Sequence, residues 1–234
     1  MSTGRILAIC AIAAAIAGIG SMRIPGADAQ PGARAPNVER GALIAAQGTA
    51  GAPACAQCHA FNGGSDGSGA FPRIAGQSAW YLAGELRDFT TGVRSNAIMT
   101  PISKALTADD IADLSAYYAA VDSPFLPLSD PDPALVKRGE QLAKVGDAKQ
   151  GLQACDNCHG PGGVGEPPTI PYLAGQYAHY TEFELRMWQQ GFRKNSLEGM
   201  AVIAKQLNAQ AIAAVAAYFQ QVRSAAPKAA EPKG

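Results

Sequence analysis

An internal repeat constrains this chain more than any other feature of its sequence. The pentapeptide Cys-Ala-Gln-Cys-His at residues 55–59 returns as Cys-Asp-Asn-Cys-His at residues 155–159, 100 positions later. The tripeptide Ala-Gly-Gln at 75–77 returns 99 positions later, and Met99 returns as Met200, 101 positions later. Offsets that drift by one or two positions are typical of a duplication with small loop insertions and deletions. The sequence therefore predicts two similar domains in tandem.

A proline-rich segment between the two copies marks the domain boundary. Residues 127–133 read Pro-Leu-Ser-Asp-Pro-Asp-Pro, and proline fixes φ and disfavours the helix interior, which predicts a semi-rigid linker. Asp132 followed by Pro133 is typical of an N-cap and a first helical residue. The expected segments are an N-terminal domain over 30–128, a linker over 129–133, a C-terminal domain over 134–224 and a disordered tail over 225–234.

The spacing of apolar residues predicts three main helices in each half. Apolar side chains near the end of each half recur at i, i+3, i+7 and i+10, which is one stripe of a helix. No segment alternates with period two over a useful length, so the fold class is all-α. Gly41 and Gly139 fall inside helices, where glycine costs about 1 kcal/mol; we expect an aromatic side chain of the third helix to pack closely there. The predicted helices cover 38–47, 79–90 and 107–121, then 134–145, 178–190 and 208–222.

The repeated Cys-x-x-Cys-His pentapeptide is typical of covalent haem c attachment. Two thiols form thioethers with the two vinyl groups of the porphyrin, and the following histidine is placed to bind the iron. A single zinc site built from both cysteine pairs is the first alternative, but the pairs belong to separate copies of the repeat. Two small disulfide loops are the second, and they would not need a histidine. The sequence predicts two haem c groups, held by Cys55, Cys58, His59, Cys155, Cys158 and His159.

Methionines supply candidates for the second axial ligand of each iron. Met99 lies 40 residues after His59 and Met200 lies 41 residues after His159, each in a predicted loop before the third helix. Met187 falls within a predicted helix and corresponds to an aspartate in the first half, so it is interpreted as a packing residue. His179 occupies the position of a tryptophan in the first half and is interpreted as a surface or interface residue.

Two further repeated pairs have open roles. The carbonyl groups of Pro72 and Pro171 are candidates to accept a hydrogen bond from the haem-binding histidines, orienting them; ordinary loop prolines are the alternative. Arg94 and Arg193 precede the methionine segments and are candidates to pair with haem propionates; the alternative is that water solvates them.

The N-terminus has the pattern of a secretory signal. Arg5 precedes an apolar run over 6–20, and Ala-Asp-Ala at 27–29 fits a cleavage site, so residues 1–29 are predicted to be removed. The run has 15 residues, fewer than the ~20 that span a bilayer. Cys10 lies within this run and leaves with it, so four cysteines remain in an oxidising compartment. Nineteen basic residues balance nineteen acidic ones, which argues against a nucleic-acid partner.

Taken with these motifs, the sequence resembles the two-haem cytochrome c4 family, built from two tandem class I cytochrome c domains. The resemblance rests on the two haem motifs, on Phe-Pro-Arg-Ile-Ala-Gly-Gln at 71–77 with its echo at 170–176, and on the two methionine segments. It implies axial pairs of His59 with Met99 and His159 with Met200, and domains related by pseudo-twofold symmetry. A departure is that Trp80 and His179 differ at equivalent positions.

The resemblance implies a periplasmic electron carrier rather than an enzyme. Its partners would be redox proteins: a quinol-oxidising complex or dehydrogenase as donor and a terminal oxidase as acceptor, with at most loose membrane association. His/Met ligation saturates the iron and raises its reduction potential. Two alternatives remain: the electron-accepting subunit of a dehydrogenase, or a two-haem enzyme such as a peroxidase or thiosulfate dehydrogenase.

Overall fold

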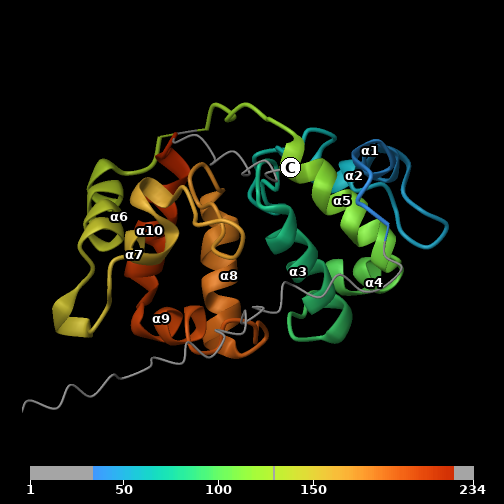
Figure 1. The fold of residues 1–234 in the computed structure, drawn as a ribbon. Helices are drawn as coiled ribbons and strands as arrows, with labels where there is room; N and C mark the ends of the chain where they lie inside the picture. Colours follow the sequence, from blue (N-terminus) through green and yellow to red (C-terminus); the bar gives the residue numbers. More distant parts are fainter. Residues whose placement is uncertain (1–33, 129, 224–234) are drawn as a thin grey trace, which may run out of the picture. The chain divides into compact units, whose positions relative to one another are not determined.

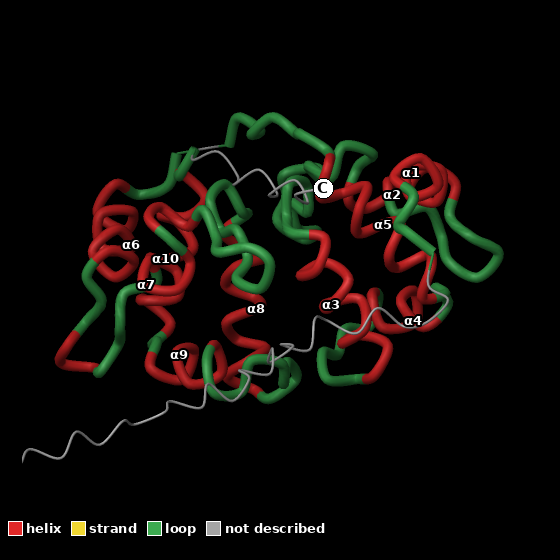
Figure 2. Tube along the Cα trace, viewed as in Figure 1, coloured by secondary structure: helices red, strands yellow, loops and turns green. Residues whose placement is uncertain are grey.

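The computed structural model describes residues 34–128 and 130–223, which are all-α apart from three isolated β-bridges (Figures 1 and 2). The predicted signal over 1–29 and the predicted tail over 225–234 lie outside the described residues. In the first half the helices are α1 Val38–Gln47, α2 Ala56–His59, α3 Ala79–Thr91, α4 Met99–Lys104 and α5 Ala108–Ala120. In the second half they are α6 Pro133–Lys144, η1 Ala148–Gln150, α7 Asp156–His159, η2 Pro161–Gly163, α8 Ala178–Gln190, α9 Met200–Gln206 and α10 Ala209–Gln221.

The six predicted main helices are confirmed to within one or two residues at each end, and their caps explain where they begin. Thr107 and Asp110 form a reciprocal capping box at the start of α5, which satisfies two otherwise unpaired N–H groups. The Asn208 side chain accepts from the N–H of Ala211 at the start of α10. Pro133 is the first residue of α6, and Asp132 caps that helix, as predicted.

The first and third main helices of each half cross at a glycine. Figure 1 shows α1 beside α5 and α6 beside α10. A Cβ atom on Gly41 would overlap the carbonyl oxygen of Asp113, and one on Gly139 would overlap that of Ala214. The same Cβ atoms would lie 2.8 and 2.7 Å from the Cβ atoms of Tyr117 and Tyr218, respectively. The close approach of an aromatic residue of the third helix is therefore confirmed.

The two halves have cores of unequal size. The buried cluster of the first half has five members, Ile44, Ala45, Leu114, Tyr117 and Tyr118. The main cluster of the second half has eleven, drawn from α6, α8, α9 and α10 and their connections, and a second cluster adds three. The first half therefore depends less on its own apolar side chains and more on whatever else fills its interior.

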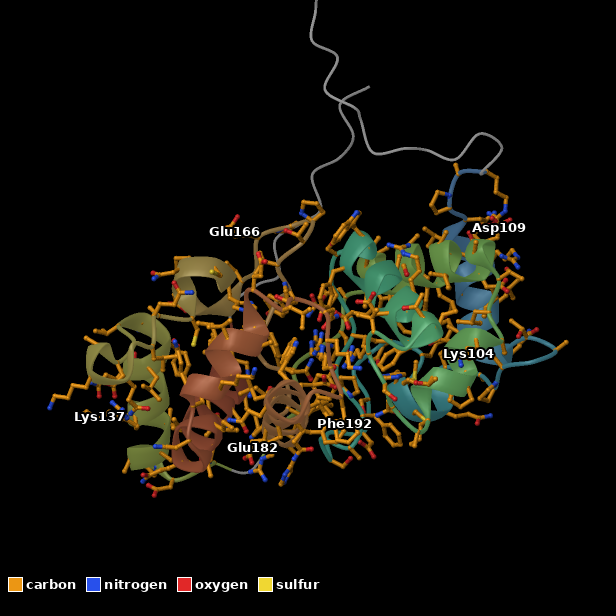
Figure 3. The ribbon with its side chains drawn as sticks, turned by 90° about the horizontal axis from the view of Figure 1, so that it is seen from below. Lys104, Asp109, Lys137, Glu166, Glu182 and Phe192 are labelled. Carbon is orange, nitrogen blue, oxygen red and sulfur yellow. The ribbon has the colours of Figure 1, made fainter. Side chains whose placement is uncertain are left out.

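Backbone contacts join the halves next to Arg94 and Arg193. Ser95 N donates to the carbonyl of Phe192 over 3.1 Å, and Lys194 N donates to that of Val93 over 2.7 Å. Figure 3 shows Phe192 where the two halves meet. Val93 and Phe192 occupy equivalent positions in the repeat, so the contact exchanges equivalent segments, as pseudo-twofold symmetry requires.

None of the described helices is by itself long and apolar enough to cross a bilayer. Among the described helices, α9 and α10 are the one pair that together reaches that length and composition, and the chain bends by 118° between them.

A buried carboxylate fastens the start of the first half to α5. The Asp113 side chain has no exposed surface and accepts from Asn37 N over 2.7 Å and from the guanidinium groups of Arg34 and Arg40. Burial opposes its ionisation, but the hydrogen bonds from Arg34, Asn37 and Arg40 outweigh burial and lower the pKa of Asp113 to about 2. The second half has Ala214 at the equivalent position, so it cannot form the same buried carboxylate interaction.

Acid should therefore weaken the attachment of Arg34, Asn37 and Arg40 to α5. Because the folded pKa of Asp113 lies below its ordinary value of 3.8, the stabilisation is complete above that value and is lost as the pH falls through about 2. Asp113→Asn should lower the stability at neutral pH and flatten the pH dependence between these two values. Thermal unfolding of both proteins across this range checks the prediction, and equal slopes would contradict it.

Candidate haem-binding sites

The two pentapeptides adopt the same local structure. Each forms a single helical turn, α2 or α7, in which the histidine N–H donates to the carbonyl of the first cysteine over 2.9 Å. The N–H of the second cysteine donates to that same carbonyl over 3.2 Å in both halves. A residue with positive φ ends each turn: Ala60 at 56° and Gly160 at 70°. The turn thus places two thiols and one imidazole together in each half.

Both histidines are buried, and Nδ1 of each ring faces a backbone carbonyl. His59 Nδ1 lies 3.1 Å from the carbonyl oxygen of Pro72, and His159 Nδ1 lies 2.9 Å from that of Pro171. A carbonyl only accepts, so Nδ1 carries the proton and Nε2 keeps its lone pair. Burial lowers the pKa of both histidines, opposed by the proline carbonyls. Each imidazole is therefore neutral with an unprotonated Nε2, and of the two roles open for the prolines the orienting one is confirmed.

The cysteines also fit covalent haem attachment. Cys55, Cys58, Cys155 and Cys158 are free thiols, which argues against small disulfide loops. Burial raises the pKa of Cys55 and of Cys155 to about 11, so both positions favour an uncharged sulfur, which a thioether also has. Within the described ranges, no three His, Cys, Asp or Glu side chains form a group that would hold a metal ion, which argues against the shared zinc site. Two thiols to bond the vinyl groups and a neutral imidazole in each half are the protein groups that haem c attachment needs.

Met99 and Met200 lie at equivalent places, but not in loops as predicted. Each is the first residue of a short helix, α4 or α9, that packs against the second main helix of its half. Asn96 Oδ1 accepts from Met99 N over 2.9 Å, and Ser196 Oγ accepts from Met200 N over 3.1 Å. These side-chain acceptors satisfy N–H groups that would otherwise be unpaired at a helix start. Both methionine side chains are half-buried.

The other two candidates lie elsewhere. Met187 is within α8 and half-buried. His179 is exposed on α8, and a Cβ on Gly69 of the other half would lie 2.8 Å from its Cβ. This position fits the surface or interface role expected of His179.

Arg94 and Arg193 are buried, so water does not solvate them. They form an ion-pair cluster with Glu85 of α3 and Glu184 of α8. Arg94 pairs with Glu85 at 2.6 Å and with Glu184, and Arg193 pairs with Glu85 at 2.8 Å and with Glu184 at 2.7 Å. The hydroxyl groups of Tyr180 and Tyr81 accept from Arg94 and Arg193, respectively. We call these four charged residues the Arg/Glu quartet.

The charges of the quartet stabilise one another despite their burial. All four side chains are at most 11% exposed. Burial opposes the charge on Glu85, but Arg193 and Arg94 outweigh it and lower its pKa. Burial also opposes the charge on Arg94, yet Tyr180, Glu184 and Glu85 raise its pKa well above the ordinary value. One feature of the sequence indicated a shared role for the two glutamates: Glu184 follows Glu85 at the repeat offset of 99.

Comparisons with known proteins agree with this duplicated site. The family model described as cytochrome c matches residues 38–121, and the one described as cytochrome c oxidase, cbb3-type, subunit III, matches residues 147–219. Cytochrome c4 of Pseudomonas aeruginosa is 37% identical over 179 residues, which are 75% of this chain and 87% of that protein. The chain belongs to the cytochrome c4 family. The solved structure of reduced cytochrome c4 from Pseudomonas stutzeri has a TM-score of 0.71 and 31% identity, covering 81% of this chain and all of that one.

Other relatives carry a different name within the same fold. The thiosulfate dehydrogenase electron acceptor of Thiomonas intermedia is 38% identical over 149 residues, which are 64% of this chain and 69% of that protein. The structure of a thiosulfate dehydrogenase, TsdBA, from Marichromatium purpuratum has a TM-score of 0.72 and 40% identity over 80% of this chain. This chain spans only 40% of that longer protein, so the cytochrome c4 family member matches one part of it.

Proposed function

We propose that this chain is a periplasmic two-haem electron carrier whose axial ligand pairs are His59 with Met99 and His159 with Met200. The observation that carries the proposal is the duplicated pair of buried, neutral histidines, each with Nδ1 bound to a proline carbonyl. A methionine begins the short helix at the equivalent place in each half. A thioether and an imidazole are the axial donors of electron-transfer haems with raised potentials.

Each part of the site has a role in such a carrier. Haem bound in each half supplies a one-electron iron couple. The four cysteine thiols anchor the two groups, and the proline carbonyls hold the histidine rings in one orientation and increase their basicity. Two protein ligands per iron leave no coordination position for a substrate, which fits a carrier rather than an enzyme. We assign residues 30–128 and 134–224 to the two haem domains, 129–133 to the linker and 1–29 to an export signal.

The partners are redox proteins. We propose a quinol-oxidising complex or a dehydrogenase as donor and a terminal oxidase as acceptor. A thiosulfate dehydrogenase is a specific second candidate for the donor, supported by the name of the Thiomonas relative and by the likeness to part of the Marichromatium enzyme. In that case reduced haem should appear when thiosulfate and a thiosulfate dehydrogenase are both present, and with neither alone.

Substituting one methionine tests the ligand assignment. In Met200→Ala the iron of the second half should lose its thioether, become high-spin and fall in potential, while the first haem stays unchanged. Carbon monoxide should then bind quickly at one of the two reduced haems. Absorbance in the sulfur-to-iron charge-transfer band, counted per haem, and the rate of carbon monoxide binding check this expectation.

The matched control is Met187→Ala, in the same half but within α8, which should leave both measurements unchanged. Met99→Ala should produce the mirror-image result in the first half. If the unmodified protein binds carbon monoxide quickly, or turns over peroxide or thiosulfate alone, the carrier assignment fails.

A further inference from the structure

Two buried glutamines reach from each half into the other. Gln77 of the first half and Gln176 of the second occupy equivalent positions in the repeat and are 7% and 8% exposed. Gln77 Nε2 donates to the carbonyl of Tyr172 over 2.6 Å, and Gln77 Oε1 accepts from Tyr172 N over 3.0 Å. Gln176 Nε2 donates to the carbonyl of Arg73 over 2.8 Å, and its Oε1 accepts from Arg73 N over 3.0 Å. Each side-chain amide thus makes two hydrogen bonds to one residue of the opposite half, one to its N–H and one to its carbonyl.

The orientation of both amides follows from these partners. A carbonyl oxygen only accepts and a backbone N–H only donates. Rotating either amide by half a turn would place oxygen against oxygen and N–H against N–H, with both pairs buried. The observed orientation is therefore the one that satisfies all four groups.

The two residues bound by these amides, Arg73 and Tyr172, directly follow the prolines that orient the haem-binding histidines. Tyr172 N and the Pro171 carbonyl are the two ends of one peptide group, and Arg73 N and the Pro72 carbonyl are the two ends of another. One continuous chain of hydrogen bonds therefore runs from His159 Nδ1 to the Pro171 oxygen over 2.9 Å, and from Tyr172 N to Gln77 Oε1 over 3.0 Å.

The same chain of bonds exists for the other histidine. It runs from His59 Nδ1 to the Pro72 oxygen over 3.1 Å, and from Arg73 N to Gln176 Oε1 over 3.0 Å. In each chain the last group belongs to the half that does not contain the histidine.

We propose that Gln77 and Gln176 are crossed positioning residues, each tuning the reduction potential of the haem in the opposite half. This inference rests on the proposed function, in which His59 and His159 bind iron. Hydrogen bonds at the two ends of one peptide group polarise each other and strengthen cooperatively. The glutamine therefore makes the proline carbonyl a better acceptor, which increases the basicity of the histidine. A more basic ligand favours the oxidised iron and lowers the potential of that haem.

The crossing has a functional consequence for a two-haem carrier. The potential of each haem depends on the docked position of the other half, so a partner that shifts the two halves apart changes both potentials without touching either ligand. The two directions are unequal, because Gln176 Oε1 also accepts from Tyr177 N over 3.0 Å. Its acceptor strength is shared, so the effect of Gln176 on the first haem should be the smaller of the two.

The test is the pair Gln77→Met and Gln176→Met in the full-length, two-haem protein. Methionine keeps the length of the side chain and removes both hydrogen bonds. Gln77→Met should raise the potential of the second haem and leave that of the first unchanged, whereas Gln176→Met should do the reverse. We expect the equilibrium constant for electron transfer between the two haems to change about threefold to tenfold. A tenfold change corresponds to 59 mV for a one-electron couple.

A second readout separates tuning from simple loss of structure. The chain has three histidines, so nitrogen-15 labelling of histidine gives few signals to assign. Gln77→Met should shift the Nδ1–H signal of His159 and leave that of His59 in place. Ser78→Ala is the matched control, since Ser78 Oγ donates across the halves to the Pro168 carbonyl over 2.8 Å. It should move neither the potentials nor the histidine signals.

Gln77→Asn keeps the experiment decisive if the methionine variant folds poorly. The shorter amide keeps both a donor and an acceptor but ends one methylene short of Tyr172, so this variant should raise the potential of the second haem by less than Gln77→Met does. Shifts confined to the haem of the substituted half, or no shift in any variant, would overturn the proposal. Failure of the proposed function would instead appear in the unmodified protein, as an iron without histidine ligation.

Discussion

Replacing Cys55 and Cys58 with alanine should unfold the first half of the molecule and leave the second haem in place. The buried cluster of the first half has only five members, and Cys55 packs directly against it. A small domain buries too little apolar surface to offset the conformational entropy of its chain without additional support. Covalently bound haem supplies that support, so losing both attachment points should abolish folding there.

Two measurements check this expectation. Far-ultraviolet circular dichroism should lose the helix content that α1, α3 and α5 contribute, and the haem absorbance should fall to one haem per chain. The matched variant, Cys155 and Cys158 to alanine, should retain more helix, because the main cluster of the second half has eleven buried members. Native-like helix content in the Cys55 and Cys58 variant, or equal losses in both variants, would contradict this account.

The long helices were predictable from the sequence because their apolar residues recur over several turns. Ile212 and Val215 of α10, for example, follow the helical period and are buried as expected. The short helices α2, α4, α7 and α9 were not predicted, because four to seven residues are too few to establish a period. Met99 and Met200 were consequently assigned to loops, although their order before the third main helix was right.

Chemistry that depends on residue type was predictable, and chemistry that depends on docking was not. Each Cys-x-x-Cys-His pentapeptide forms its site within one helical turn, so its thiols and histidine were predictable from the local sequence. Gln77 and Gln176 end the repeated segments at 71–77 and 170–176, but their role appears only when each half meets the other. Glu85 and Glu184 resemble ordinary surface charges on amphipathic helices, so no local pattern marked them as buried.

Removing one charge from the Arg/Glu quartet should strongly lower the free energy of unfolding. The quartet joins α3 to α8, and its four formal charges sum to zero. Glu184→Gln would leave two buried guanidinium groups facing a single carboxylate. Breaking a buried pair in this way costs about 3–5 kcal/mol, because the remaining charge is uncompensated. Denaturant unfolding should show this loss of free energy, and the two halves should then unfold in separate transitions.

Two controls separate burial from charge. Glu182, labelled in Figure 3, lies on α8 like Glu184. It pairs at 3.0 Å with Arg186, whose side chain is 50% exposed. Glu182→Gln should cost less than about 1 kcal/mol, as expected for a surface pair. Glu184→Leu combined with Arg193→Met removes one charge of each sign and should cost less than Glu184→Gln alone, since neutrality returns. If the double variant is the less stable of the two, direct pairing rather than charge balance holds the halves together, and the electrostatic account of the interface is wrong.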